Sequence, residues 1–340
     1  MTGPRTRAAA PLALLLLLAA CGGPPAASVS SAQPSSPSSP SASSKASASP
    51  SAPPKPTRAR ATTQTWRLPF PVARQVVLPD QRRPGQVVVA GGLLPGDQTT
   101  GRSFRLDLST GHVMDLPPLG VPVHDAAGGT YAGNPAVFGG GNATEQSVVQ
   151  ALVGNRWRSV DRMPTTRSDL VVADTTAGTL VIGGYDGVNV PRKILRQRGS
   201  GSLQSWGTLS AGVRYAAAVP LGGAVYVFGG EVNQRELDAV QRIDLRTGRT
   251  RVVGHLPRPL GHAQAVAVGG RILLMGGRTD ASTQTAQMWW FDAGTAHVTR
   301  AGRLPVPISD AAAVAQGGSV WLLGGESPLM RDRVVRIRVS

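Results

Sequence analysis

The sequence predicts an all-β fold made of six similar units. Paired glycines recur with spacings of 48, 44, 46, 47 and 48 residues, and a fixed period near 47 indicates structural repeats. A short apolar run precedes each pair, and no long amphipathic helical pattern is present. The six pairs are Gly91-Gly92, Gly139-Gly140, Gly183-Gly184, Gly229-Gly230, Gly276-Gly277 and Gly324-Gly325.

The apolar runs before the glycines predict strands that are buried on both faces. They are too short for helices, they lack polar alternation, and they are rich in β-branched and aromatic residues, as in VYVF at 225–228. A glycine at the end of such a strand removes the side chain where another backbone comes close. We therefore expect the glycine pairs to lie where neighbouring units pack together.

Six glycine pairs in phase, each behind an apolar run, resemble the kelch repeat. The resemblance covers the chain from about Thr65 to its end. In that family each repeat is one four-stranded blade of a β-propeller. The resemblance therefore implies a six-bladed β-propeller of four-stranded, kelch-type blades.

The other strands of each unit follow from a comparison of the repeats. Small residues, such as Ala216–Ala218 and Ala311–Ala313, precede the glycine strand and suit an innermost position, where blades converge on an axis. A third strand ends in aspartate, as at Asp107 and Asp244. A tight turn then leads to an outer fourth strand that tends to finish in Leu-Pro or Met-Pro.

The last repeat lacks a fourth strand, because the chain stops after Val334–Val339. At the other end, Thr65–Pro69 has the form of a fourth strand and precedes the first inner strand. We expect this N-terminal strand to join the last blade, since closing the ring removes the exposed strand edges of an open array.

The N-terminus has the features of an export signal. Arg5 and Arg7 precede an apolar run over residues 8–20 that is too short to span a bilayer. Leu18-Ala19-Ala20-Cys21-Gly22 resembles the lipobox of bacterial lipoproteins, in which the cysteine becomes the lipid-modified first residue. An ordinary signal peptide with an accidental cysteine is the alternative. Cys21 is the only cysteine, so no disulfide framework or thiolate metal site is expected.

The sequence divides into three parts. Residues 1–20 are the expected signal peptide. Residues 21–63 are expected to be a disordered tether, because from residue 22 they are mostly Ser, Pro and Ala and contain no acidic residue. Residues 64–340 are the expected propeller. The protein should thus be extracytoplasmic and lipid-anchored to the cell membrane.

The formal net charge is +16, and arginine supplies most of it. The basic residues are spread through the repeats without forming a run. They could attract an anionic lipid, a wall polymer or nucleic acid, or they could simply form a solvated surface. The second explanation is favoured, and export argues against nucleic acid as the partner.

No sequence motif for catalysis is present. The chain lacks His-Glu-x-x-His, Gly-x-Ser-x-Gly and a phosphate-binding loop, so no cofactor and no metal are expected. Galactose-oxidase-like kelch proteins need copper and a cysteine-linked tyrosine, and this propeller has no cysteine. Six-bladed exported kelch proteins also include sialic acid epimerases (mutarotases), whose chemistry could use one carboxylate and one arginine. Arg214 and Glu231 are candidates for that pair.

The candidate binding site is the mouth of the central channel. In a four-stranded meander, the loops between blades and the loops after the glycine pairs emerge on the same side. Six polar residues lie just ahead of the small inner strands and should surround this opening. They are Arg74, Asp125, Asp169, Tyr215, His262 and Asp310.

These residues suggest a monomeric binding or scaffolding module for a protein or glycan of the cell envelope. A ring of three carboxylates, a guanidinium, a phenol and an imidazole suits a polar ligand. Its carboxylates are expected to be exposed and to contribute little to stability. Binding should change near the pKa of His262. The alternatives are an epimerase, or six solvated residues at strand entries with no ligand.

Overall fold

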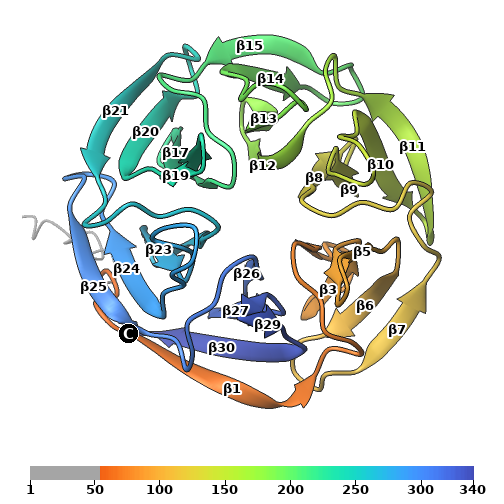
Figure 1. Cartoon of the computed structure of the whole chain (residues 1–340), viewed down its shortest axis with the longest axis horizontal. Coiled ribbons are helices and arrows are strands. Elements are labelled where there is room, and N and C mark those ends of the chain that lie inside the picture. The colour runs from red at the N-terminus through yellow and green to blue at the C-terminus, as the bar shows by residue number, and fades with distance from the viewer. Residues whose placement is uncertain (1–53) are drawn as a thin grey trace, which may run out of the picture. The chain divides into compact units, whose positions relative to one another are not determined.

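The computed structural model describes residues 54–340, which form six four-stranded antiparallel sheets arranged in a ring (Figure 1). Each sheet is one blade of a β-propeller, and its strands run from the central axis to the rim. The predicted all-β, six-bladed fold is confirmed. The part of the chain that the structure describes contains no helix able to cross a membrane.

Three blades follow one another along the first half of the domain. Blade 1 consists of β2 (Val76–Pro79), β3 (Gln86–Ala90), β6 (Ser103–Asp107) and β7 (Val113–Leu116). Blade 2 consists of β8 (Ala127–Tyr131), β9 (Asn134–Phe138), β10 (Val148–Val153) and β11 (Arg156–Arg162). Blade 3 consists of β12 (Ser168–Thr175), β13 (Gly178–Tyr185), β14 (Lys193–Gln197) and β15 (Gln204–Thr208).

The second half repeats the pattern, and its last blade takes a strand from the N-terminal end. Blade 4 consists of β16 (Ala217–Leu221), β17 (Ala224–Phe228), β20 (Ala239–Asp244) and β21 (Thr250–His255). Blade 5 consists of β22 (Gln264–Val268), β23 (Arg271–Met275), β24 (Gln287–Phe291) and β25 (Val298–Arg303). Blade 6 consists of β26 (Ala312–Gln316), β27 (Ser319–Leu323), β30 (Arg333–Val339) and β1 (Ala59–Arg67).

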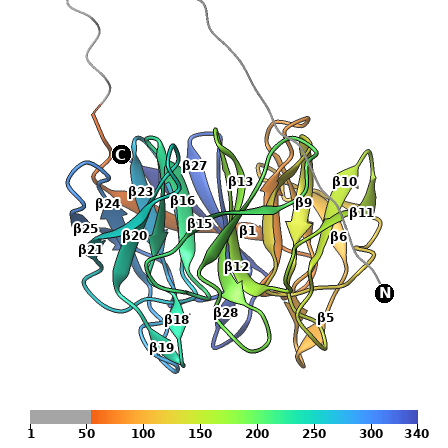
Figure 2. The ribbon, with the colours of Figure 1, turned by 90° about the horizontal axis from the view of Figure 1, so that it is seen from above.

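Short hairpins follow the glycine pairs of three blades. They are β4 (Leu93–Leu94) with β5 (Gln98–Thr99), β18 (Glu231–Val232) with β19 (Arg235–Glu236), and β28 (Glu326–Ser327) with β29 (Leu329–Met330). All three project from the same face of the ring (Figure 2). We call this the mouth face.

Inner strands carry small residues because neighbouring blades nearly touch at the axis. A Cβ added to Gly128, on β8, would lie 2.6 Å from Cγ1 of Val76 on the inner strand of blade 1. That separation is shorter than van der Waals contact between carbon atoms. The taper predicted from the alanines is therefore real.

The glycine pairs mark the close approach between blades. Gly229 and Gly230 have φ angles of 52° and 93°, and a Cβ on Gly230 would lie 2.7 Å from the carbonyl oxygen of Arg214. A Cβ on Gly229 would meet the carbonyl oxygen of Leu260, which leads into blade 5. Both the left-handed backbone and the absence of space require glycine here.

The hydrophobic core lies between blades rather than at one centre. Phe228 of β17 packs against Phe291 of β24 with ring centroids 5.1 Å apart, and both side chains are buried. Trp290, on the other face of β24, is fully buried in the cluster that joins blades 5 and 6. Each blade thus depends on both of its neighbours for burial.

Strand β1 closes the ring, as the sequence predicted. It pairs antiparallel with β30 from Ala59 opposite Val339 to Arg67 opposite Arg333. The ring centroids of Trp66 and Trp321, on β27, are 6.2 Å apart. A Cβ on Gly111 of blade 1 would collide with the Trp66 side chain. The N-terminal strand therefore seals the junction between blades 6 and 1.

The expected boundary at residue 64 is wrong, because β1 begins at Ala59. The backbone N–H groups of Thr57 and Arg58 also donate to the carbonyl oxygen of Ser340. A Ser/Pro/Ala-rich composition concealed this part of the strand, since alanine and threonine serve equally in a tether and on an outer strand. The expected signal peptide and residues 21–53 of the expected tether, including Cys21, lie outside the described residues.

The described chain enters the domain on the face opposite the mouth. Strand β30 starts beside the mouth-face hairpin β28–β29 and ends at the far side, where β1 begins (Figure 2). The turns between first and second strands, and between third and fourth strands, lie on this same side. We call it the entry face.

Strand β1 should be essential for stability, which can be tested with two truncated chains. A chain that starts at Gln64 loses the pairing of Ala59–Thr63 with β30 and should be less stable than one that starts at Pro54 by several kcal/mol, about 1 kcal/mol per lost hydrogen bond. Thermal unfolding followed by circular dichroism measures the difference. Equal melting temperatures would show that this part of β1 does not close the ring.

Candidate functional site

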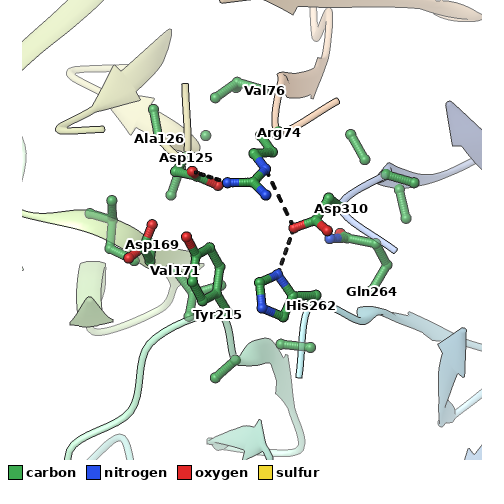
Figure 3. A pocket seen from close by; sticks show the side chains of 18 of the residues that line it. Arg74, Val76, Asp125, Ala126, Asp169, Val171, Tyr215, His262, Gln264 and Asp310 are labelled. Carbon is green, nitrogen blue, oxygen red and sulfur yellow. Dashed lines mark hydrogen bonds and ion pairs between the residues drawn. The ribbon is translucent and has the colours of Figure 1, made fainter. Parts of the chain in front are cut away.

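The six predicted residues come together at the mouth of the central channel. Five of them lie two residues before the inner strand of a blade, Asp169 is the second residue of β12, and their side chains point toward the axis (Figure 3). Together they line one cavity. The structure thus brings together all six residues singled out in the sequence, and their role as ligand-binding residues stays a prediction.

A closed ring of backbone hydrogen bonds joins the six residues. Each N–H donates to the carbonyl oxygen of its counterpart in the preceding blade, and the N···O distances run from 2.8 to 3.2 Å. The last bond, from Arg74 N to Asp310 O at 2.8 Å, joins blade 1 to blade 6. The ring therefore holds all six blades in register around the axis.

This ring places all six residues in the left-handed backbone region, with φ between 49° and 58°. Glycine adopts that conformation most easily, yet none of the six positions has glycine. Asp and His are several-fold enriched there, so four of the residues are unsurprising. Arg74 and Tyr215 are bulky residues that gain nothing locally from a left-handed backbone.

The expectation that these carboxylates are exposed is wrong. Asp169 and Asp310 are each 6% exposed, and His262 is 7% exposed. The physical reason is the convergence of six blades, which brings every side chain at this level against its neighbours. Tyr215 and His262, for example, stack with ring centroids 3.9 Å apart.

Asp310 is the centre of an ion-pair network. His262 donates from Nδ1 to Asp310 Oδ1 over 2.7 Å, and Arg278 donates from Nη2 to Asp310 Oδ2 over 2.8 Å. Burial would raise the pKa of Asp310, but His262, Arg74 and Arg278 together hold it well below its usual range. Asp310 is thus ionised at all ordinary pH values.

The same network keeps His262 protonated. Burial alone would lower the pKa of His262, but its hydrogen bonds to Asp310 and Glu231 raise it to about 9. The Nε2 to Glu231 Oε2 distance is 3.4 Å, and this contact lowers the pKa of Glu231. The prediction that binding changes near the ordinary pKa of His262 is therefore revised, because the imidazolium does not titrate near pH 6.5.

Asp125 and Asp169 are the groups that titrate near neutrality. Burial raises the pKa of Asp125 to about 6, although Arg74 Nη1 donates to its Oδ2 over 3.0 Å. Burial, followed by the charge of Asp125, raises the pKa of Asp169 to about 7. Two carboxyl groups on one side of the channel therefore keep their protons to a higher pH than an exposed aspartate does.

Asp169 also carries an unsatisfied oxygen. Arg214 Nη2 lies 2.8 Å from Asp169 Oδ2, but the pair is not aligned as a hydrogen bond, and Oδ2 has no hydrogen-bond donor within the described residues. Arg214 instead donates to the Tyr215 hydroxyl over 3.1 Å. Its guanidinium also lies 4.8 Å from the ring centre of Tyr185.

Sequence reasoning missed a second layer of charged residues. Arg278 and Glu326 directly follow the glycine pairs of blades 5 and 6, as Glu231 does in blade 4. Arg278 Nη2 bonds Glu326 Oε2 over 2.8 Å, and Arg74 Nε bonds Glu326 Oε1 over 3.1 Å. Their shared position after Gly-Gly was a signal that could have found them.

The candidate pair Arg214 and Glu231 lies in this layer. The two residues form an antiparallel backbone bridge at the mouth of blade 4. Each contacts a ring residue, since Arg214 reaches Asp169 and Glu231 reaches His262. The structure therefore places both beside the channel mouth.

The cavity that the ring surrounds has a volume of about 240 Å³. Below the charged ring its wall consists mainly of Ala and Val from the inner strands. Ordinary small-molecule pockets measure roughly 300–1,000 Å³. The channel can thus accept a small group, such as one sugar ring or one side chain, rather than a large ligand.

Metal binding has no support in the geometry. Within residues 54–340, no three His, Cys, Asp or Glu side chains are arranged to hold a metal ion. The acidic groups of the mouth are matched instead by arginines and His262.

Comparisons with known proteins agree with the fold. The model of the Kelch motif matches residues 213–249, which form most of blade 4, and with six such blades it supports a kelch-repeat propeller. The solved structure of YjhT superposes with a TM-score of 0.69 at 16% identity, over 81% of this chain and 98% of that one. At this identity the likeness shows the fold alone. No curated protein matches the sequence.

Two isosteric substitutions should change stability in opposite directions. Asp310→Asn breaks a buried network and should destabilise the domain by about 3 kcal/mol at pH 7. Asp169→Asn should stabilise it at pH 8 by at least about 1 kcal/mol, because the raised pKa of Asp169 makes its ionisation unfavourable in the folded state.

The difference in stability between Asp169→Asn and the unsubstituted protein should depend on pH. The contribution of Asp169 is greatest below its unfolded pKa of about 4 and is lost as the pH rises to about 7, so the advantage of the Asn variant should grow over that interval. Urea unfolding at several pH values measures it. Asp115→Asn, at an exposed position on β7, is the matched control. A pH-independent effect of Asp169→Asn would contradict the raised pKa.

Proposed function

We propose that the protein is a membrane-tethered, extracytoplasmic kelch propeller that binds a polar group of a protein or glycan partner at the channel mouth. The lipid anchor is Cys21, on the basis of its lipobox-like context. The binding residues are the six ring residues, assisted by Arg214, Glu231, Arg278 and Glu326.

Arg74 and Tyr215 carry this proposal. A bulky non-glycine residue in the left-handed region is destabilising by about 1–3 kcal/mol, and such residues cluster at ligand sites. At both positions glycine would satisfy the backbone ring without strain. The presence of a guanidinium and a phenol facing the channel, at positions where the backbone favours glycine, supports a binding role for these side chains.

The chemistry of the mouth fits a ligand that both donates and accepts hydrogen bonds. Asp169 Oδ2 is ion-paired with Arg214 but accepts no aligned hydrogen bond, and Arg214 Nε is a buried donor that has no hydrogen-bond partner within the described residues. A hydroxyl group can satisfy both. Polar groups held rigidly by ion pairs also give orientation and specificity without rearrangement.

The orientation of the domain fits an anchored receptor. The described chain enters at the face opposite the mouth, so an anchor that precedes residue 54 leaves the mouth free to point away from the membrane. Partners in the cell envelope can then reach it.

An enzyme of the epimerase type is the second candidate, and one observation favours it. Asp125 and Asp169 have pKa values of about 6 and 7, which suit proton transfer at neutral pH, and Arg74 and Arg214 lie beside them. Accelerated exchange between the anomers of a sugar, followed by NMR, would identify this activity. Its loss in Asp169→Asn with retained sugar binding would assign the carboxyl a role in the chemistry.

Ligand binding should depend on the ring residues without loss of the fold. Arg74→Gln and Tyr215→Phe each keep the approximate shape of the side chain, and each should weaken binding by roughly tenfold through the loss of one strong hydrogen bond. Glycan arrays and envelope extracts supply ligands, and calorimetry measures affinity. Tyr131→Phe, on the opposite end of blade 2, is the control.

Affinity should also change between about pH 6 and pH 7, where Asp125 and Asp169 ionise. A profile centred near pH 9 would assign the dependence to His262 instead. Normal binding by both ring variants, with loss in variants of the outer loops, would disprove the proposal.

The anchor is tested separately. Cys21→Ser removes the only thiol and should release the protein from membranes into the soluble fraction at high ionic strength, while the melting temperature of the propeller stays unchanged. Fractionation of expressing cells, followed by immunoblotting, measures the distribution. Retention of the Ser variant after high-salt and carbonate washes would contradict lipid anchoring.

A further inference from the structure

The excess positive charge lies almost entirely away from the mouth. We divide residues 54–340 into a mouth half, which contains the mouth-face connections and the two adjoining residues of each strand, and an entry half, which contains the rest. The mouth half has 14 Lys or Arg and 14 Asp or Glu. The entry half has 18 Lys or Arg and only five Asp.

The acidic residues of the entry half are already engaged. Asp80 accepts from Arg105 over 2.8 Å, Asp244 pairs with Arg242 at 3.3 Å, and Asp292 pairs with Lys55 at 2.8 Å. The other two, Asp107 and Asp174, accept hydrogen bonds from serine or threonine hydroxyl groups. They cannot neutralise the remaining arginines.

Six exposed arginines lie at the turns of the entry face or beside the start of β1. They come from blades 1, 2, 3, 4 and 6, and none is within 4.0 Å of a carboxylate among the described residues. Such charges repel one another, which destabilises the compact state. They are Arg58, Arg82, Arg156, Arg198, Arg246 and Arg249.

The chain is attached at this same face. Before β1 starts, Arg271 Nη1 donates to the carbonyl oxygen of Pro56 over 3.0 Å, and Lys55 bonds Asp292 across the turn of blade 5. The chain leading toward Cys21 thus leaves the domain on the entry face, at its rim beside blades 5 and 6 (Figure 1). About 33 residues separate Cys21 from Pro54, which for a flexible chain corresponds to an end-to-end distance of about 30 Å.

We propose that the entry face docks on an anionic phospholipid surface. Guanidinium groups at the turn tips bind headgroup phosphates, for which their planar donors are well suited. Tethering keeps the domain at a high effective concentration near the bilayer, so individually weak contacts are sufficient. In the docked domain the mouth half, whose basic and acidic residues are equal in number, faces away from the membrane. This surface does not depend on the identity of the channel ligand.

The test uses the full chain with Cys21→Ser, so that no lipid anchor contributes. The protein is mixed with vesicles of phosphatidylglycerol and phosphatidylcholine, or of phosphatidylcholine alone, and sedimented. We expect the protein to sediment with the vesicles that contain phosphatidylglycerol and to stay in solution with those of phosphatidylcholine alone. It should disappear when the ionic strength is raised from about 0.05 M to about 0.5 M, because screening shortens the reach of surface charges.

Two variants with equal loss of charge locate the surface. The quadruple substitution of Arg82, Arg156, Arg246 and Arg249 to Gln should reduce partitioning at least tenfold. The matched quadruple substitution of Arg235, Arg258, Arg303 and Arg333 to Gln, in the mouth half, should reduce it less than twofold.

Equal losses in the two variants would overturn the proposal, because they would show an effect of net charge alone. Absence of binding to anionic vesicles would also overturn it, as would retention on polyphosphate beads without vesicle binding, which would assign the face to a polymer. Since ligand affinity and membrane release of the Ser variant are measured separately, failure here leaves the channel and anchor proposals untouched.

Discussion

The closed ring of six backbone hydrogen bonds is the constraint on which the rest of the structure depends. It holds one residue at the entry to each inner strand in a left-handed conformation, with its side chain directed toward the axis. At this level the blades are so close that side chains must pack against one another. Geometry that holds the blades in register therefore also gathers six functional groups at one opening.

Burial at the axis changes the chemistry of these groups. In water, the carboxyls of Asp169 and Asp310 would behave alike. Here Asp310, surrounded by His262, Arg74 and Arg278, stays ionised, whereas Asp169, with poorly aligned Arg214 beside it, has a pKa of about 7. One ring thus contains both a permanent anion and a carboxyl that can carry a proton at neutral pH.

The two faces of the propeller differ in their balance of charge. At the mouth, bases and acids are equal in number, and the arginines around the channel form short ion pairs with neighbouring acids, which favours recognition of a polar group. On the entry side, arginines outnumber acids, and six exposed arginines have no carboxylate partner among the described residues, which favours binding to a polyanionic surface. The described chain also enters the domain on this basic side.

The sequence by itself determined the six-bladed fold, its closure by an N-terminal strand and the six residues of the ring. These follow from a repeat period and from local patterns such as Gly-Gly after an apolar run. The sequence did not reveal that Ala59–Thr63 belongs to the first strand, because the composition of this segment matches that of a tether. Only the tertiary structure decided that Asp310 is buried with His262, that Arg278 and Glu326 join the network, and that arginine gathers on one face. The physical reason is that successive connections of every blade alternate between the two faces, so charges that mix along the chain separate in space.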